Sequence, residues 1–174
     1  MTPSHTNTLT VLRKLATERI LVHEKIAPAF FRTMLPAYRK AGVEIRGCAR
    51  TKQLAPWVKA AKPSDYGKEF LELTLAVKIV GSLEEAMAHI ARYGSMHTDA
   101  IITRDHARAM RFVAEVDSSS VIVNASTRFS DGFQYGLGAE MGISTQKLHA
   151  RGPMGLEELT CQKFIVFGDG QIRE

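Results

Sequence analysis

The sequence has few cysteines and no long apolar run. Its 174 residues include two cysteines, Cys48 and Cys161, which lie far apart and outside any C-x-x-C or metal-ligand spacing, so neither a disulfide framework nor a metal site is expected. No apolar stretch approaches the roughly 20 residues that span a bilayer, and Met1 to Leu15 lacks the apolar core of a secretory signal. The sequence therefore predicts a cytoplasmic protein with reduced thiols that neither enters nor crosses a membrane.

The sequence also lacks a concentrated basic patch and the common catalytic motifs. The formal net charge is +5, but Lys and Arg are scattered and are not interleaved with the aromatic residues, which make up 7% of the chain. Nucleic-acid binding is therefore not expected, and an anionic metabolite or cofactor accounts for the charge equally well. HExxH and the phosphate-binding GxxxxGK[ST] are absent, and Gly136-Leu137-Gly138 lacks the third glycine of a dinucleotide fingerprint.

The apolar pattern predicts alternating strands and helices. The expected strands are 20–22, 43–45, 71–80, 100–102, 121–123 and 164–167, and residues 49–68 are expected to run over the surface. Helices are expected from Pro28 to Tyr38, after a capping box at Ser82 and Glu85, and after Thr103 or Asp105, with Ala109, Met110 and Val113 turned inward. This order predicts an α/β fold with a mostly parallel sheet flanked by helices, and ligand sites at the carboxyl ends of its strands.

The stretch from Val121 to Leu159 has little apolar periodicity and is rich in Gly, small hydroxyl residues, Arg and His. Such a segment is usually a site, a partner surface or a linker. Within it, Asn124-Ala125-Ser126-Thr127-Arg128 follows a predicted strand, and Arg128 could form a bidentate contact with a carboxylate or phosphate. A simple turn remains the alternative. Arg151-Gly152-Pro153 is a weaker anion site by the same reasoning, or part of an arm that crosses to another subunit.

Four further side chains are ambiguous. Cys48 lies between Arg46 and Arg50, which would favour a thiolate, but no base is evident, and a structural role is more usual. His97 and His149 are either site residues or ordinary loop histidines. Glu69, just before a predicted strand, is expected from the sequence alone to be a solvated carboxylate.

Several long motifs resemble those of gamma-glutamyl phosphate reductase (glutamate-5-semialdehyde dehydrogenase), a family in the aldehyde dehydrogenase superfamily. The likeness covers about residues 18 to 173. The motifs that carry it are Gly47-Cys48, Tyr93-Gly94-Ser95, His97-Thr98-Asp99-Ala100, Val123-Asn124-Ala125-Ser126-Thr127-Arg128-Phe129, Gly136-Leu137-Gly138-Ala139-Glu140 and Lys147-Leu148-His149-Ala150-Arg151-Gly152-Pro153-Met154-Gly155-Leu156-Glu157.

The resemblance implies an aldehyde-dehydrogenase-like catalytic domain with an extended oligomerisation arm. It implies that gamma-glutamyl phosphate is reduced with NADPH to glutamate semialdehyde in proline biosynthesis, through a thioester on a cysteine. Glu69 is similar to the superfamily glutamate that holds the nicotinamide ribose. Asn124, Ser126, Thr127 and Arg128 resemble the loop that faces the substrate, and His149 to Pro153 resembles the base of an arm that packs between subunits of a homo-oligomer.

The chain departs from the family pattern at the nucleophile. In the family the cysteine lies in a Pro-Gly-Val-Cys-Asn-Ala-Met-Glu-Thr motif; Glu18 and Ile20-Leu21-Val22-His23 match the segment around its end, and counting back places the cysteine at Lys14. Residues 1–17 are expected to be an unrelated segment, residues 18–174 the catalytic domain with its arm, and the Rossmann-like cofactor domain to be missing. A truncated reductase, inactive alone, is therefore expected. The alternative is a non-enzymatic module that docks on a full-length reductase or on a separate cofactor domain.

Overall fold

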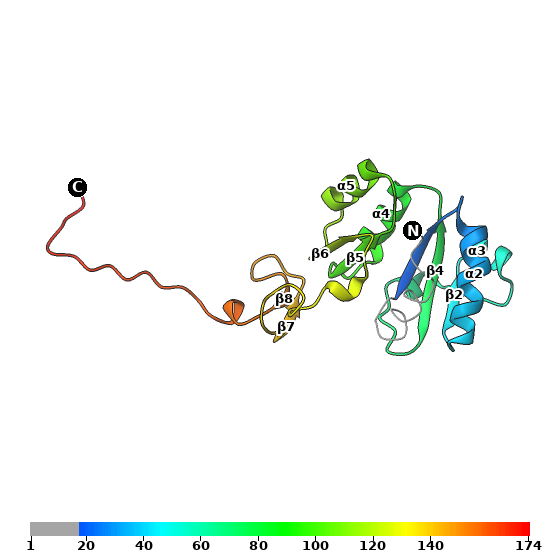
Figure 1. The fold of residues 1–174 in the computed structure, drawn as a ribbon, viewed down its shortest axis with the longest axis horizontal. Coiled ribbons are helices and arrows are strands. Elements are labelled where there is room, and N and C mark those ends of the chain that lie inside the picture. Colours follow the sequence, from blue (N-terminus) through cyan, green and yellow to red (C-terminus); the bar gives the residue numbers. More distant parts are fainter. Residues whose placement is uncertain (1–17) are drawn as a thin grey trace. The chain divides into compact units, whose positions relative to one another are not determined.

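The computed structural model describes residues 18–174, so Lys14 lies outside the described residues. These residues form two compact units that divide between Phe129 and Ser130 (Figure 1). No helix among residues 18–174 is long and apolar enough to cross a membrane.

The first unit is built on a four-stranded sheet with the order β1-β4-β2-β3, and its pairings are all parallel. The strands are β1 (Arg19–His23), β2 (Glu44–Gly47), β3 (Lys59–Ala60) and β4 (Thr74–Val80). Six of the seven residues of β4 are buried, because this strand has neighbours on both sides and layers above and below it. A nearly continuous apolar run is typical of such a central parallel strand.

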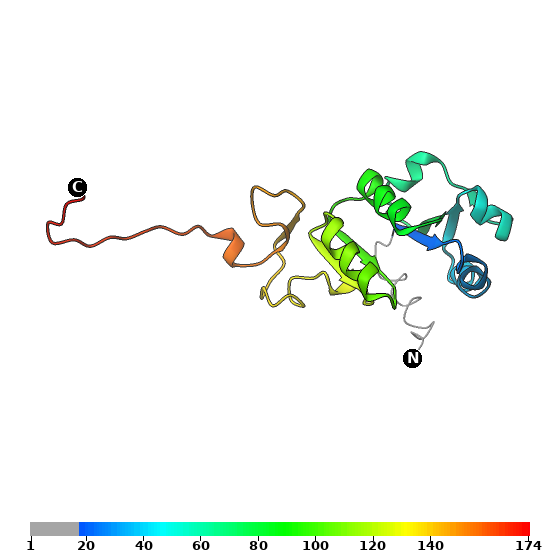
Figure 2. The ribbon, with the colours of Figure 1, turned by 90° about the horizontal axis from the view of Figure 1, so that it is seen from above.

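Helices cover both faces of this sheet, as Figures 1 and 2 show. On one face, α2 (Ala27–Lys40) and α3 (Ala49–Leu54) pack over Leu75, Val77 and Ile79 and enclose the main core around Tyr38. On the other face lie η1 (Pro63–Tyr66) and α4 (Leu83–Tyr93), where Tyr66 packs on Ala76. Consecutive β4 residues thus serve different layers, as the period of two in a strand requires.

Local signals explain where two of the helices begin. Pro28 lies in the first turn of α2, where its missing N–H has no intrahelical partner in any case. Ser82 caps α4 by accepting a 3.2 Å hydrogen bond from the Glu85 amide. Half of the predicted capping box is therefore present. The Glu85 carboxylate accepts from the Gly81 amide at 2.7 Å, one residue before the cap that the motif predicts.

A smaller parallel sheet completes the first unit. It pairs β5 (Thr98–Ile101) with β6 (Ser120–Val123), and Ile101 lies opposite Val123. Helix α5 (His106–Glu115) contacts β6 and α4, and its N-cap is Asp105, whose carboxylate accepts from the Arg108 amide at 3.1 Å. The short helix η2 (Thr127–Phe129) contacts β5.

The second unit, Ser130–Glu174, contains the antiparallel pair β7 (Gly142–Ser144) and β8 (Gly152–Met154), followed by η3 (Glu157–Leu159). Beyond residue 160 the chain is extended and forms neither a helix nor a strand. The buried residues of this unit are small or cyclic: Gly132, Gly152, Pro153 and Gly155.

The α/β fold is confirmed, but several details of the sequence-based prediction are wrong. The mostly parallel strands form two separate sheets, not one. Residues 49–68 contain α3, β3 and η1, and bury Thr51 and Asp65. No strand forms at 164–167, and no other described segment pairs with these residues in a sheet. Helix α5 buries Ala109 and Phe112 but leaves Met110 and Val113 exposed, because only a narrow stripe of it faces β6 and α4.

Candidate functional site

The turn after β6 brings together four of the residues predicted to form the site. The chain leaves β6 at Asn124, whose amide donates a 2.9 Å hydrogen bond to the carbonyl of Ile101 at the end of β5. It then turns through Ser126 into η2, where the Arg128 amide donates to the Ser126 hydroxyl at 3.2 Å and the Phe129 amide to the Ser126 carbonyl at 3.1 Å. The site therefore lies at the carboxyl ends of two parallel strands, as the sequence predicts.

The Asn124 side chain is held by the neighbouring loop. Its Oδ1 accepts from the Thr103 amide at 2.9 Å, and its Nδ2 donates to the Thr103 carbonyl at 2.8 Å. Asn124 also has a φ of 55°, in the left-handed region that asparagine enters more readily than most residues. The amide thus bridges the loops that follow β5 and β6.

Arg128 is exposed, and among residues 18–174 no carboxylate or carbonyl accepts a hydrogen bond from its guanidinium. Ser126 and Thr127 beside it are half-buried. Five N–H donors in a planar fork are therefore available next to two hydroxyl groups, an arrangement suited to an anionic carboxylate or phosphate oxygen.

Glu69 lies elsewhere in the first unit. It is exposed in the irregular segment between η1 and β4, before the amino end of β4. Within the described part of the chain no cation pairs with its carboxylate, so it is open to a ligand hydroxyl. The Asn124–Phe129 turn, by contrast, follows the carboxyl end of a strand in the other sheet.

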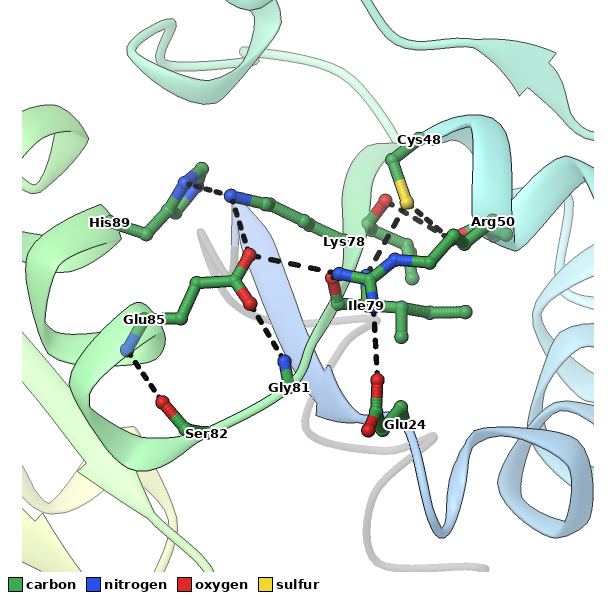
Figure 3. Close-up of polar contacts among 11 residues, drawn as sticks. Glu24, Cys48, Arg50, Lys78, Ile79, Gly81, Ser82, Glu85 and His89 are labelled. Atoms are coloured by element: carbon green, nitrogen blue, oxygen red, sulfur yellow. Dashed lines mark hydrogen bonds and ion pairs between the residues drawn. The ribbon is translucent and has the colours of Figure 1, made fainter.

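The structure also shows a polar network that the sequence did not predict (Figure 3). The Glu85 carboxylate on α4 lies 3.3 Å from Lys78 Nζ and 3.7 Å from an Arg50 nitrogen. Arg50 in turn bonds the Ile79 carbonyl at 2.6 Å and Glu24 at 3.1 Å. The network ties α3, α4 and the end of β1 to the central strand.

His89 lies at the inner end of this network, packed between Tyr66 and Tyr93 with ring centroids 4.9 and 4.7 Å away. Its Nδ1 is 3.4 Å from Lys78 Nζ. Burial lowers the pKa of His89 from its usual 6.5 to about 4, and the charges of Lys78 and Arg19 act in the same direction. His89 is therefore a neutral core residue that accepts a proton only in acid.

Lowering the pH from about 6.5 to about 4 should destabilise the chain through His89. In this window the unfolded chain binds a proton on His89 that the folded chain does not, so the free energy of unfolding falls as pH falls, by up to about 3 kcal/mol. Urea unfolding at several pH values measures this. In His89→Gln the slope over this window should be clearly smaller; an equal slope would show that other groups cause it.

Cys48 occupies a helix N-cap position and has no catalytic partner among residues 18–174. It is the N-cap residue of α3, and its Sγ lies 3.5 Å from the Ile79 amide and 3.3 Å from the Thr51 hydroxyl. Partial burial raises the pKa of the thiol, but these hydrogen bonds outweigh it, so the pKa lies below its usual value. No histidine or carboxylate in residues 18–174 contacts the sulfur, which supports the structural alternative over the nucleophilic one.

The remaining candidates are His97 in the first unit and His149 and Cys161 in the second. His97 Nδ1 is 2.7 Å from the Thr98 hydroxyl at the start of β5, while His149 and Cys161 are exposed in the second unit. The part of the chain that the structure describes contains no group of three His, Cys, Asp or Glu residues able to hold a metal ion. A cleft of about 370 Å³ opens between Gly81 to Glu84 and the first turns of α5 and includes none of the predicted site residues.

Comparison with known proteins gives one consistent result. The chain is 58% identical over 159 residues to a gamma-glutamyl phosphate reductase of Thermodesulfovibrio yellowstonii, an alignment that covers 91% of this chain and 38% of the relative. It also superposes on the crystal structure of gamma-glutamyl phosphate reductase from Thermotoga maritima with a TM-score of 0.88 and 44% identity, over 98% of this chain and 44% of the other. The chain thus spans about two fifths of the length of the proteins it matches.

More distant structures share the fold alone. An acetylating aldehyde dehydrogenase from Geobacillus thermoglucosidasius superposes with a TM-score of 0.50 at 15% identity, over 98% of this chain and 49% of that enzyme. No protein-family profile matches the chain.

Proposed function

Since the chain belongs to the gamma-glutamyl phosphate reductase family, of whose members it spans about 38%, we propose that it provides the catalytic-domain part of such a reductase. The reaction of the whole enzyme would be the NADPH-dependent reduction of gamma-glutamyl phosphate to glutamate 5-semialdehyde, a step in proline biosynthesis in the cytoplasm. The 58% identity over 159 residues carries the proposal. A free-standing docking module is not favoured, because these relatives are named as reductases.

The substrate end of the proposed site is the turn from Asn124 to Arg128. The exposed Arg128 guanidinium would pair with the phosphate or the carboxylate of the substrate, and the hydroxyls of Ser126 and Thr127 would add neutral hydrogen bonds. Their place at the carboxyl ends of β5 and β6 supports this role.

Glu69 is the proposed cofactor contact. NADP would supply the hydride, and the Glu69 carboxylate would accept hydrogen bonds from the hydroxyls of the nicotinamide ribose. Its exposure and the absence of a cationic partner in residues 18–174 fit that role, since a carboxylate already paired with Lys or Arg would bind a neutral hydroxyl less well.

The nucleophile is the element that this chain lacks. By the family spacing, the cysteine that would form the thioester corresponds to Lys14. We therefore propose that the chain retains substrate recognition but performs no chemistry by itself.

Titration with inorganic phosphate tests the recognition half of the proposal. Arg128→Ala should weaken phosphate binding to the chain at least about tenfold, the size expected for loss of a charge-assisted contact. Arg32→Ala is the matched control: Arg32 is exposed on α2 and the substitution removes the same charge. Isothermal titration calorimetry measures the phosphate affinity of both variants. Equal affinities for Arg128→Ala and Arg32→Ala would exclude Arg128 as the anion contact.

A further inference from the structure

The Asn124 side chain offers one carbonyl oxygen as acceptor and two N–H donors. Its oxygen and one of its N–H groups both bond to a single residue. Both bonds go to the backbone of Thr103, at 2.9 and 2.8 Å, so the pair resembles one rung between two strands. One Nδ2 N–H lies outside this pair, so a ligand could bind that donor alone unless it broke one of the two bonds.

The Thr103 backbone leads directly to helix α5. The Thr103 hydroxyl accepts from the Asp105 amide at 3.1 Å, and Asp105 is the N-cap of α5. The hydrogen bonds therefore run without interruption from Asn124, at the end of β6, to the start of the helix that packs against that strand.

The turn that carries Arg128 depends on this attachment. β5 and β6 are four residues each and pair only with one another within the described chain, so they give the turn a narrow base. Beyond Val123, the Asn124 amide returns to β5 by a hydrogen bond to the Ile101 carbonyl. The Asn124 side chain adds two bonds to Thr103 in the loop after β5, and η2 contacts β5 itself.

We propose that Asn124 is a positioning residue: its side chain clamps the loop after β6 to the loop after β5 and thereby sets the direction of Arg128, while Asn124 itself does not contact the substrate. This inference rests on the proposed function for the role of Arg128. It revises the sequence-based expectation that Asn124 binds the substrate directly. The left-handed φ of 55° fits the role, since few residues could both enter this conformation and provide the amide.

Amide hydrogen exchange in the whole chain tests the clamp. The Thr103 N–H donates to Asn124 Oδ1, so Asn124→Gly, which keeps the left-handed backbone accessible, should speed its exchange about five- to tenfold. Mass spectrometry of peptides that cover residues 101–106 follows this. Asn124→Asp keeps an acceptor oxygen and should restore most of the protection, a rescue that a mere loss of packing would not show.

Phosphate titration of the same variant tests the positioning role. Asn124→Gly should weaken phosphate binding about tenfold at a temperature well below its unfolding transition, although Arg128 is intact. Weaker binding with unchanged Thr103 exchange would show direct contact by Asn124 and overturn the inference, as would faster exchange with unchanged phosphate affinity. If Arg128→Ala leaves phosphate binding unchanged, the proposed function fails and the positioning role fails with it, while the exchange result still decides whether the clamp exists.

Discussion

The purified chain should self-associate, and the second unit should be the main cause. Its large apolar side chains are mostly exposed, at 94% for Phe164, 88% for Val166 and 93% for Phe167. Its buried residues are three glycines and a proline, so Ser130–Glu174 has no apolar core of its own. Burial of each exposed phenylalanine would contribute about 2 kcal/mol, which favours contact with another surface. We therefore expect dimers or larger species at micromolar concentration by light scattering.

Charged substitutions should locate the surface through which the chain self-associates. Phe164→Asp combined with Phe167→Asp should shift the chain towards the monomer. Leu71→Asp in the first unit is the matched control, because Leu71 is 93% exposed and lies outside the second unit. A clean monomer for the unaltered chain would contradict the prediction, and an equal effect of Leu71→Asp would place the contact elsewhere. The second unit also contains His149 to Pro153, which the family resemblance implies to be the base of an arm between subunits.

Elements with local signals were predictable. Helix α4 begins after a Ser82 cap and ends before Gly94, and α2 begins at Ala27 with Pro28 in its first turn, because capping and proline chemistry depend on residues within one turn. The strand predicted from Leu71 begins only at Thr74. Its start is decided by its neighbour, since the pairing with β2 begins at Glu44 and Thr74, and Leu71 lies beyond that register.

Long-range pairing explains what the sequence could not show. The run Phe164–Phe167 has the composition of a strand but no strand beside it. In the site, the contiguous Asn124–Arg128 motif was visible as a polar turn after a strand. The role of Asn124 was not, because it depends on Thr103, which is 21 residues away. The Lys78–His89 contact likewise joins a strand to the next helix, and no motif marks it.

The chain should show no reductase activity alone. Thioester formation needs a thiolate, and by the proposed family spacing the nucleophile position is Lys14, whose side chain carries no thiol. An acylated amine would in any case be an amide, which does not yield an aldehyde by hydride transfer. Cys48 is not expected to replace the nucleophile, because its sulfur contacts the Ile79 amide and the Thr51 hydroxyl and has no base beside it in the described structure.

The most direct test is the rate of NADPH formation from glutamate semialdehyde, phosphate and NADP by the purified chain, with the intact Thermodesulfovibrio yellowstonii relative as positive control. We expect a rate equal to that of buffer for the chain and for its Cys48→Ala variant. Measurable turnover by the chain that survives Cys48→Ala would contradict the claim that it keeps the scaffold and substrate turn of the reductase without its nucleophile.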